Sequence, residues 1–212
     1  MATARAPSRR SVPAVVWLLV AASVLPEAVL ALAELGVWGH PKWRLIAYQY
    51  GAFWSGLMHG WRPSFPGQPV AMFATYGLLH GGLSHLALNM ATLIAFGAVL
   101  APRFGTGSFL LLYVLSQIGG GLAFGWLTTD GAPMVGASGA IFGLAGAFLV
   151  LTARQLRARQ RSILPVVQSA GAIALLNLVL WWAMDGTLAW QAHLGGFVAG
   201  GLYAALMTSR WA

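Results

Sequence analysis

Four polar side chains, set in otherwise apolar segments, are of the types that acyl transfer to a hydroxyl requires. Ser138 could act as a nucleophile, and His193 could act as the base that takes its proton. His85 and Asn89 carry N–H groups that could donate hydrogen bonds to the negative oxygen of a tetrahedral intermediate. Because the four residues lie in three separate stretches of the sequence, this chemistry depends on a fold that gathers them.

Ser138 lies among small residues in the stretch MVGASGAIFG, residues 134–143. One interpretation is structural, because small residues let two membrane helices approach closely. The other is chemical, because glycines leave room for a substrate backbone beside a nucleophilic hydroxyl. The pattern differs from the G-x-S-x-G elbow of soluble hydrolases, since Gly139 directly follows Ser138. The motif alone leaves both interpretations open.

The composition indicates a membrane protein. The chain has 212 residues, of which 58% are hydrophobic and 8% charged, whereas soluble domains carry about 25% charged residues. The formal net charge of +8 does not point to nucleic acid, because most arginines form short clusters between apolar runs, as in proteins oriented in a bilayer. Cysteine is absent, which excludes disulfides and thiolate ligands. We expect no cofactor, no metal and no nucleic-acid partner.

Six stretches have about the length that a membrane-spanning helix needs, which is roughly 20 predominantly apolar residues. They are predicted at residues 12–34, 82–101, 107–127, 137–153, 164–184 and 192–209. These runs lack the alternating pattern of barrel strands, so the predicted fold is an all-α bundle of six transmembrane helices. Residues 1–11 would form an N-terminal tail, residues 210–212 a C-terminal end, and residues 35–81 a long outer loop.

The first stretch has two interpretations. As a membrane span it must tolerate Pro26 and Glu27 near its outer end. Arg9-Arg10 before it and Ala31-Leu32-Ala33 within it also resemble a secretory signal with its cleavage site. The sequence therefore leaves open whether this segment is retained or removed.

The basic residues predict the orientation in the membrane. With the N-terminus in the cytoplasm, nine basic residues lie inside and three outside, and the opposite orientation reverses this. Lys42, Arg44 and Arg62 are the three outside, all in the long loop. The nine inside are Arg5, Arg9, Arg10, Arg103, Arg154, Arg157, Arg159, Arg161 and Arg210. We expect a bacterial inner-membrane protein with both termini in the cytoplasm.

The loop of residues 35–81 is rich in Trp, Tyr and Phe. A short amphipathic helix is expected around Leu45 to Met58, lying in the membrane interface. Its aromatic residues either anchor the chain at headgroup level or shape an opening for a substrate. His40 and His59 lack acidic or histidine partners at ligand spacing, so they are interpreted as interfacial residues.

Glycine spacing predicts which helices meet. On the sixth stretch, Gly196 and Gly200 follow His193 on one helix side. On the fourth, Gly139 and Gly143 form a matching surface after Ser138. If these smooth faces are in contact, Ser138 and His193 come together at similar depth.

The second, fourth and sixth stretches all enter the membrane from the same side. His85 and Asn89 are four residues apart and share a helix face near the start of the second stretch. Polar residues inside membranes usually face the bundle interior. Topology therefore puts Ser138, His193, His85 and Asn89 in one layer below the outer surface, as an acyl-transfer site requires.

These motifs resemble those of the rhomboid family of intramembrane serine proteases. The matching pieces lie on the second, fourth and sixth stretches and are His80-x4-His85-x3-Asn89, Gly136-Ala137-Ser138-Gly139 and Ala192-His193-x2-Gly196-x3-Gly200. The resemblance implies a dyad of Ser138 and His193 without a carboxylate. It also implies transmembrane protein substrates, cleaved near the outer membrane face.

Further roles follow from the same resemblance. It implies an oxyanion hole formed by His85, Asn89 and the Ser138 amide. It also implies that His80 supports the outer loop and that Phe142 packs on the catalytic histidine. Asp185 is the acid nearest to His193 in sequence and is interpreted as a loop residue.

Two alternatives belong to other functional classes. One is a catalytically inactive relative that binds or escorts membrane proteins, although such proteins typically lose the serine or the histidine. The other is a small transporter, which is disfavoured because charged residues are missing from the middle of the predicted spans. The sequence predicts no oligomeric state.

Overall fold

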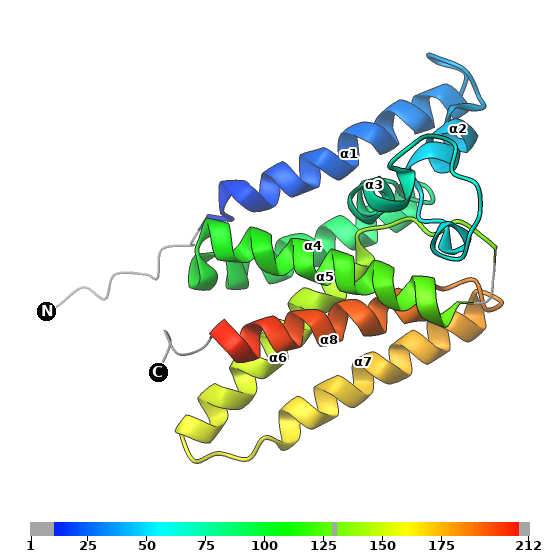
Figure 1. Ribbon diagram of the computed structural model, residues 1–212. Coiled ribbons are helices and arrows are strands. Elements are labelled where there is room, and N and C mark those ends of the chain that lie inside the picture. Colours follow the sequence, from blue (N-terminus) through cyan, green and yellow to red (C-terminus); the bar gives the residue numbers. More distant parts are fainter. Residues whose placement is uncertain (1–10, 129–130, 208–212) are drawn as a thin grey trace, which may run out of the picture.

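The long helices of the computed structural model follow the apolar stretches of the sequence (Figure 1). The structure describes residues 11–128 and 131–207. The long helices within these ranges are α1 (Ala14–Glu34), α4 (Leu83–Phe104), α5 (Thr106–Leu127), α6 (Ser138–Ala158), α7 (Leu164–Ala183) and α8 (Trp190–Met207). The N-terminal tail up to residue 10 and the C-terminal end at 210–212 lie outside the described residues, as do the last two residues of the stretch 192–209.

The predicted all-α class is confirmed for the described part of the chain. Five helices there have the length and composition of membrane spans, namely α1, α4, α5, α6 and α7. Helix α8 is not among these five, and its 18 residues include several glycines as well as Gln191 and His193. Composition therefore supports five of the six predicted spans directly.

Close backbone contact explains why α8 is rich in glycine. A Cβ atom on Gly196 would collide with the carbonyl oxygen of Gly139, and one on Gly200 with the carbonyl oxygen of Gly143. On its other side, α8 meets α5, where a Cβ on Gly195 would collide with a backbone carbonyl. The predicted contact between the glycine faces of α6 and α8 is confirmed. These contacts let α8 pack closely against both α6 and α5.

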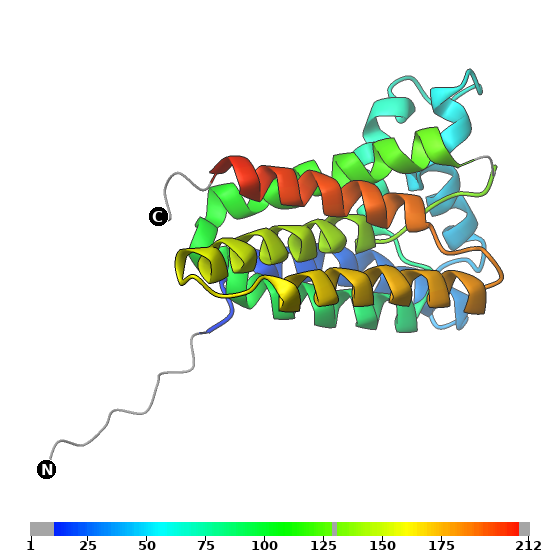
Figure 2. The same ribbon diagram turned by 90° about the horizontal axis from the view of Figure 1, so that it is seen from below.

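Helix α7 lies at the edge of the bundle. None of its residues, all of which the structure describes, is buried. Figures 1 and 2 both show it running along the outside, next to α6 and α8. Pro165 stands in its first turn, where the missing backbone N–H has no helical partner to lose.

The segment between α1 and α4 folds into short helices. They are α2 (Trp43–Gly51), η1 (Ser55–Met58), α3 (Gln68–Thr75) and η2 (Tyr76–Leu78). The helix expected around Leu45 to Met58 is wrong in extent, because the chain becomes extended at Ala52 and α2 ends at Gly51. The reason is a long-range pairing in which Phe53 and Met134 exchange two backbone hydrogen bonds of 2.9 Å. This pairing fixes the segment to the strand-like piece that leads into α6.

Glu27, the acid that interrupts the first apolar stretch, is fully buried on α1. Arg44 of α2 forms a two-pronged ion pair with it, both N···O distances being 2.9 Å, and also binds Glu34. A buried carboxylate is tolerated when it is paired and hydrogen-bonded in this way. The hydrogen bonds that Arg44 donates to Glu34 and Glu27 raise the pKa of its guanidinium above the ordinary value. The ion pair explains how α1 continues past Glu27, and it ties α2 to α1.

Candidate active site

Ser138 and His193 are in hydrogen-bond contact. The Nε2 atom of His193 lies 2.8 Å from the Oγ atom of Ser138. Ser138 is the first residue of α6, and His193 lies in the first turn of α8. The glycine contacts between these two helices set the separation of the side chains. Because the hydroxyl donates, Nε2 accepts, and the proton of the neutral ring is on Nδ1.

The ring of His193 is held on two further sides. Phe142, one turn after Ser138, stacks on it with ring centroids 4.0 Å apart and planes 5° apart. The Nδ1 atom lies 2.8 Å from the Oδ1 atom of Asn177 on α7. Asn177 was not among the site residues predicted from the sequence. The signal that could have found it is an amide flanked by apolar residues within a largely apolar helix, since polar groups in such helices usually have a partner.

His85 and Asn89 approach the same place from the first two turns of α4. Gly136, two residues before Ser138, lies against both: a Cβ atom on it would be 3.0 Å from His85 Nε2 and 3.9 Å from Asn89 Nδ2. Gly136 also has φ near +125°, which favours glycine. Glycine at this position therefore leaves space between the chain entering α6 and the two nitrogen atoms.

The backbone fixes the tautomer of His85. The N–H of Gly81 donates to His85 Nδ1 over 3.2 Å. Because Nδ1 accepts, the neutral ring carries its proton on Nε2, the atom that faces Gly136. Asn89 donates one N–H to the His85 carbonyl at 3.0 Å and has a second N–H available. Two donors can thus point at an oxygen placed beside Ser138.

A family profile described as the Rhomboid domain matches residues 67–210, which is more than half of the chain and includes all four site residues. The chain belongs to the rhomboid family. It is 34% identical over 128 residues to Rhomboid protease GluP of Bacillus subtilis, covering 60% of this chain and 24% of that protein. It is 36% identical over 135 residues to Rhomboid protein 1, mitochondrial, of Saccharomyces cerevisiae, covering 58% of this chain and 38% of that one. The chain therefore matches less than half the length of these relatives.

Membership in the rhomboid family agrees with the apolar helices. The chain is an integral, multi-pass membrane protein of a family that includes intramembrane proteases. Its similarity to both bacterial and mitochondrial relatives means that family membership alone does not select a compartment.

In this rhomboid the backbone of His80 connects the site to the short helices before α4. The carbonyl oxygen of His80 accepts from Arg44 at 2.8 Å and from the Tyr48 hydroxyl at 2.7 Å. The His80 ring is fully buried, 5.2 Å from the His85 ring in an edge-to-face arrangement. Burial, with a smaller contribution from His85, lowers the pKa of His80 to about 4. Arg44, which pairs with Glu27 of α1, thus supports His80. The next residue, Gly81, orients the ring of His85.

Three other titratable residues of this rhomboid are not part of the contact between Ser138 and His193. Asp185 lies exposed in the turn after α7, and the Nδ1 bond of His193 goes to Asn177 instead. The Nε2 atom of His59 is 2.8 Å from the carbonyl oxygen of Gly125, and His40 Nδ1 accepts from the backbone N–H of Lys42. Within the described ranges, His, Cys, Asp and Glu side chains form no group of three or more that could hold a metal ion.

Proposed function

We propose that this rhomboid is an intramembrane serine endopeptidase that cleaves transmembrane proteins near the outer membrane face. The observation that carries the proposal is the 2.8 Å contact between His193 Nε2 and Ser138 Oγ. It is supported by two nitrogen donors, His85 Nε2 and Asn89 Nδ2, which lie close to Gly136, two residues before Ser138. A nucleophile, a base and oxyanion donors within one site are the components of acyl transfer.

The proposed reaction uses these groups in turn. His193 takes the Ser138 proton on Nε2 as Oγ attacks the carbonyl carbon of the scissile peptide bond. The oxyanion is held by His85 Nε2–H, by the free N–H of Asn89 and by the backbone amide of Ser138 at the positive end of α6. His193 then protonates the leaving amine, and water, activated by the same ring, releases the acyl group from Ser138.

The proposal includes the placement of the chain in the membrane. Helix α8 would be the sixth span, residues 12–209 the membrane domain, and residues 35–81 the outer loop. Supporting this, α4, α6 and α8 begin at the same end of the bundle, beside α2 and α3 (Figure 1). On the arginine distribution, we further propose that both termini are cytoplasmic. We also propose that the membrane is a bacterial inner membrane.

Labelling with a fluorophosphonate, which reacts with activated serines, tests the proposal. The purified protein should label at Ser138, and Ser138→Ala and His193→Ala should each abolish labelling and cleavage of a synthetic transmembrane substrate. The double variant should be no worse than either single variant, because the two residues act as one unit. Ser169→Ala, on the exposed face of α7, is the control and should label normally.

The opposite outcome would support the alternative of a rhomboid that binds membrane proteins without cleaving them. In that case the native protein would not label. A Ser138→Ala variant that retained more than about one hundredth of the native cleavage rate, a loss typical of an auxiliary donor, would contradict the assigned nucleophile.

A further inference from the structure

The hydrogen bond from His193 to Asn177 joins the general base to the helix at the edge of the bundle. We propose that Asn177 is a positioning residue, the third member of a Ser-His-Asn unit, which holds His193 in the tautomer that can accept the Ser138 proton. The inference rests on the proposed function, because it assigns His193 as the base. It adds a side-chain hydrogen-bond acceptor to the dyad implied by the family resemblance, which was a dyad without a carboxylate.

The two nitrogen atoms of the His193 ring have different partners. A neutral imidazole carries one proton, and only the unprotonated nitrogen can accept another. Ser138 Oγ lies at Nε2 and Asn177 Oδ1 at Nδ1, both at 2.8 Å. An oxygen acceptor at Nδ1 favours the form that is protonated there, which leaves Nε2 free to take the serine proton.

The same contact becomes stronger during the reaction. When His193 has accepted the proton, its Nδ1–H is part of a cation, and hydrogen bonds from charged donors are roughly twice as strong as neutral ones. Asn177 Oδ1 would therefore stabilise the protonated base more than the resting one. An interaction that strengthens toward the transition state raises the rate of the chemical step.

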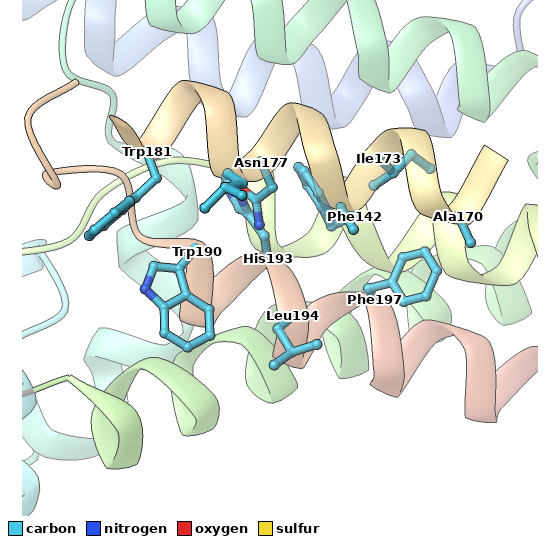
Figure 3. A pocket seen from close by; sticks show the side chains of 11 residues that line it. Phe142, Ala170, Ile173, Asn177, Trp181, Trp190, His193, Leu194 and Phe197 are labelled. Atoms are coloured by element: carbon cyan, nitrogen blue, oxygen red, sulfur yellow. The ribbon is translucent and has the colours of Figure 1, made fainter. Parts of the chain in front are cut away.

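The surroundings of Asn177 favour an amide over a carboxylate. Asn177 and His193 lie in a cleft of about 580 Å³ between α7 and α8, whose other lining side chains are aliphatic or aromatic (Figure 3). Such a cleft has a low local dielectric, which strengthens the hydrogen bond but makes an ionised carboxylate costly. An amide supplies the acceptor without a charge.

The position of α7 decides whether the acceptor is in place. None of its residues is buried, and all of them are described by the structure. Figure 3 shows Asn177 reaching from α7 to His193 on α8, beside Phe142. The hydrogen bond between Asn177 and His193 therefore depends on how α7 packs against its neighbours.

The test compares three variants on α7. Asn177→Leu keeps the approximate size of the side chain but removes the acceptor. Asn177→Asp keeps an acceptor oxygen at the same place. Gln168→Leu is the matched control, because it replaces an exposed amide on the same helix by the same residue. The measurements are the rate of fluorophosphonate labelling at Ser138, and kcat and KM for a synthetic transmembrane substrate.

We expect Asn177→Leu to lower the labelling rate and kcat about two- to tenfold, the range for losing one neutral hydrogen bond, with KM unchanged. Asn177→Asp should recover part of this loss, and Gln168→Leu should match the native protein. A loss confined to KM, or equal losses in Asn177→Leu and Gln168→Leu, would overturn the positioning role.

A spectroscopic measurement separates this inference from the proposed function. In protein labelled with ¹⁵N-histidine, the His193 signal, identified by its absence in His193→Ala, should report a proton on Nδ1. Asn177→Leu should move that proton partly or wholly to Nε2, whereas Gln168→Leu should not. An unchanged tautomer in Asn177→Leu would refute the inference even if Ser138 labels. Failure of the native protein to label would instead refute the proposed function, whatever the tautomer.

Discussion

Asn89 forms one hydrogen bond within its own helix and retains one N–H that faces the site. If Asn89 only stabilised the helix bundle, its loss would lower stability. If it is an oxyanion donor, its loss would lower the rate of cleavage. The average hydrogen bond between membrane helices is worth about 0.6 kcal/mol, which would appear as lost thermal stability. A donor used when charge develops on the carbonyl oxygen affects the rate instead.

We therefore predict that Asn89→Ala lowers the rate of cleavage by about 10²–10³, with little change in KM or in the melting temperature in detergent. His85→Ala should act in the same direction, and the two losses should not add if both groups bind one oxygen. Thermal unfolding and steady-state kinetics on the same preparation check this. Near-normal turnover together with a large drop in melting temperature would return Asn89 to a structural role.

His80 provides a prediction about pH and stability. Its pKa is lowered to about 4 by burial, whereas the unfolded chain would titrate near the ordinary value of 6.5. Between these values the unfolded state binds the proton and the folded state does not, so stability falls as the pH is lowered. We expect the melting temperature in detergent to decrease from pH 6.5 toward pH 4. His80→Gln, which cannot titrate, should show a weaker decrease, and equal slopes in both proteins would contradict the buried neutral ring.

At the scale of elements, the sequence predicted some contacts and could not predict others. Glycines at helical spacing predicted that α6 and α8 meet, because helix faces without side chains let the two backbones approach closely. Helix α7 is apolar almost all round, so its composition does not say which side faces the bundle. For that reason Asn177 could not be assigned to His193 from the sequence. The pairing of Phe53 with Met134 was equally hidden, because no periodicity links two such distant segments.

The ion pair between α1 and α2 was missed for a related reason. Glu27 and Arg44 are separated by a turn and by the end of α1, so their meeting depends on how α2 folds back. In the predicted first span, Glu27 was a charged residue that the span had to tolerate. The structure shows instead that it is a fully buried partner of a cation that also holds the His80 carbonyl.

Removing one member of this pair should have two consequences. Arg44→Ala leaves Glu27 buried without its partner, which typically destabilises a protein by about 3–5 kcal/mol. It also removes a donor to His80, next to the Gly81 amide that orients His85. We expect a lower melting temperature and slower labelling of Ser138 at temperatures where the protein is still folded. Arg62→Ala is the control, because Arg62 is an exposed cation of the same segment. Equal behaviour of the two variants would argue against a role for the ion pair.

For the whole molecule, the direction of the helices decides whether the site can exist. Helices α4, α6 and α8 begin at one end of the bundle, where α2 and α3 lie (Figure 1). The last turn of α6, with Arg157, and the loop from α6 to α7, with Arg159 and Arg161, lie at the other end. If cytoplasmic loops carry the excess of arginine, the site end faces outward.

This arrangement leads to a prediction about topology. Reporter fusions after Met1, within residues 154–161 and after Ala212 should all report the cytoplasm, and a fusion within the exposed turn at Gly60 should report the outside. The reason is that lysine and arginine in short loops resist translocation, whereas the three basic residues of the long segment are subject to a weaker bias. An odd number of retained spans would give opposite results for the first and last fusions. An outside signal from residues 154–161 would place Ser138 and His193 at the cytoplasmic face, and the proposed cleavage near the outer face would then be wrong.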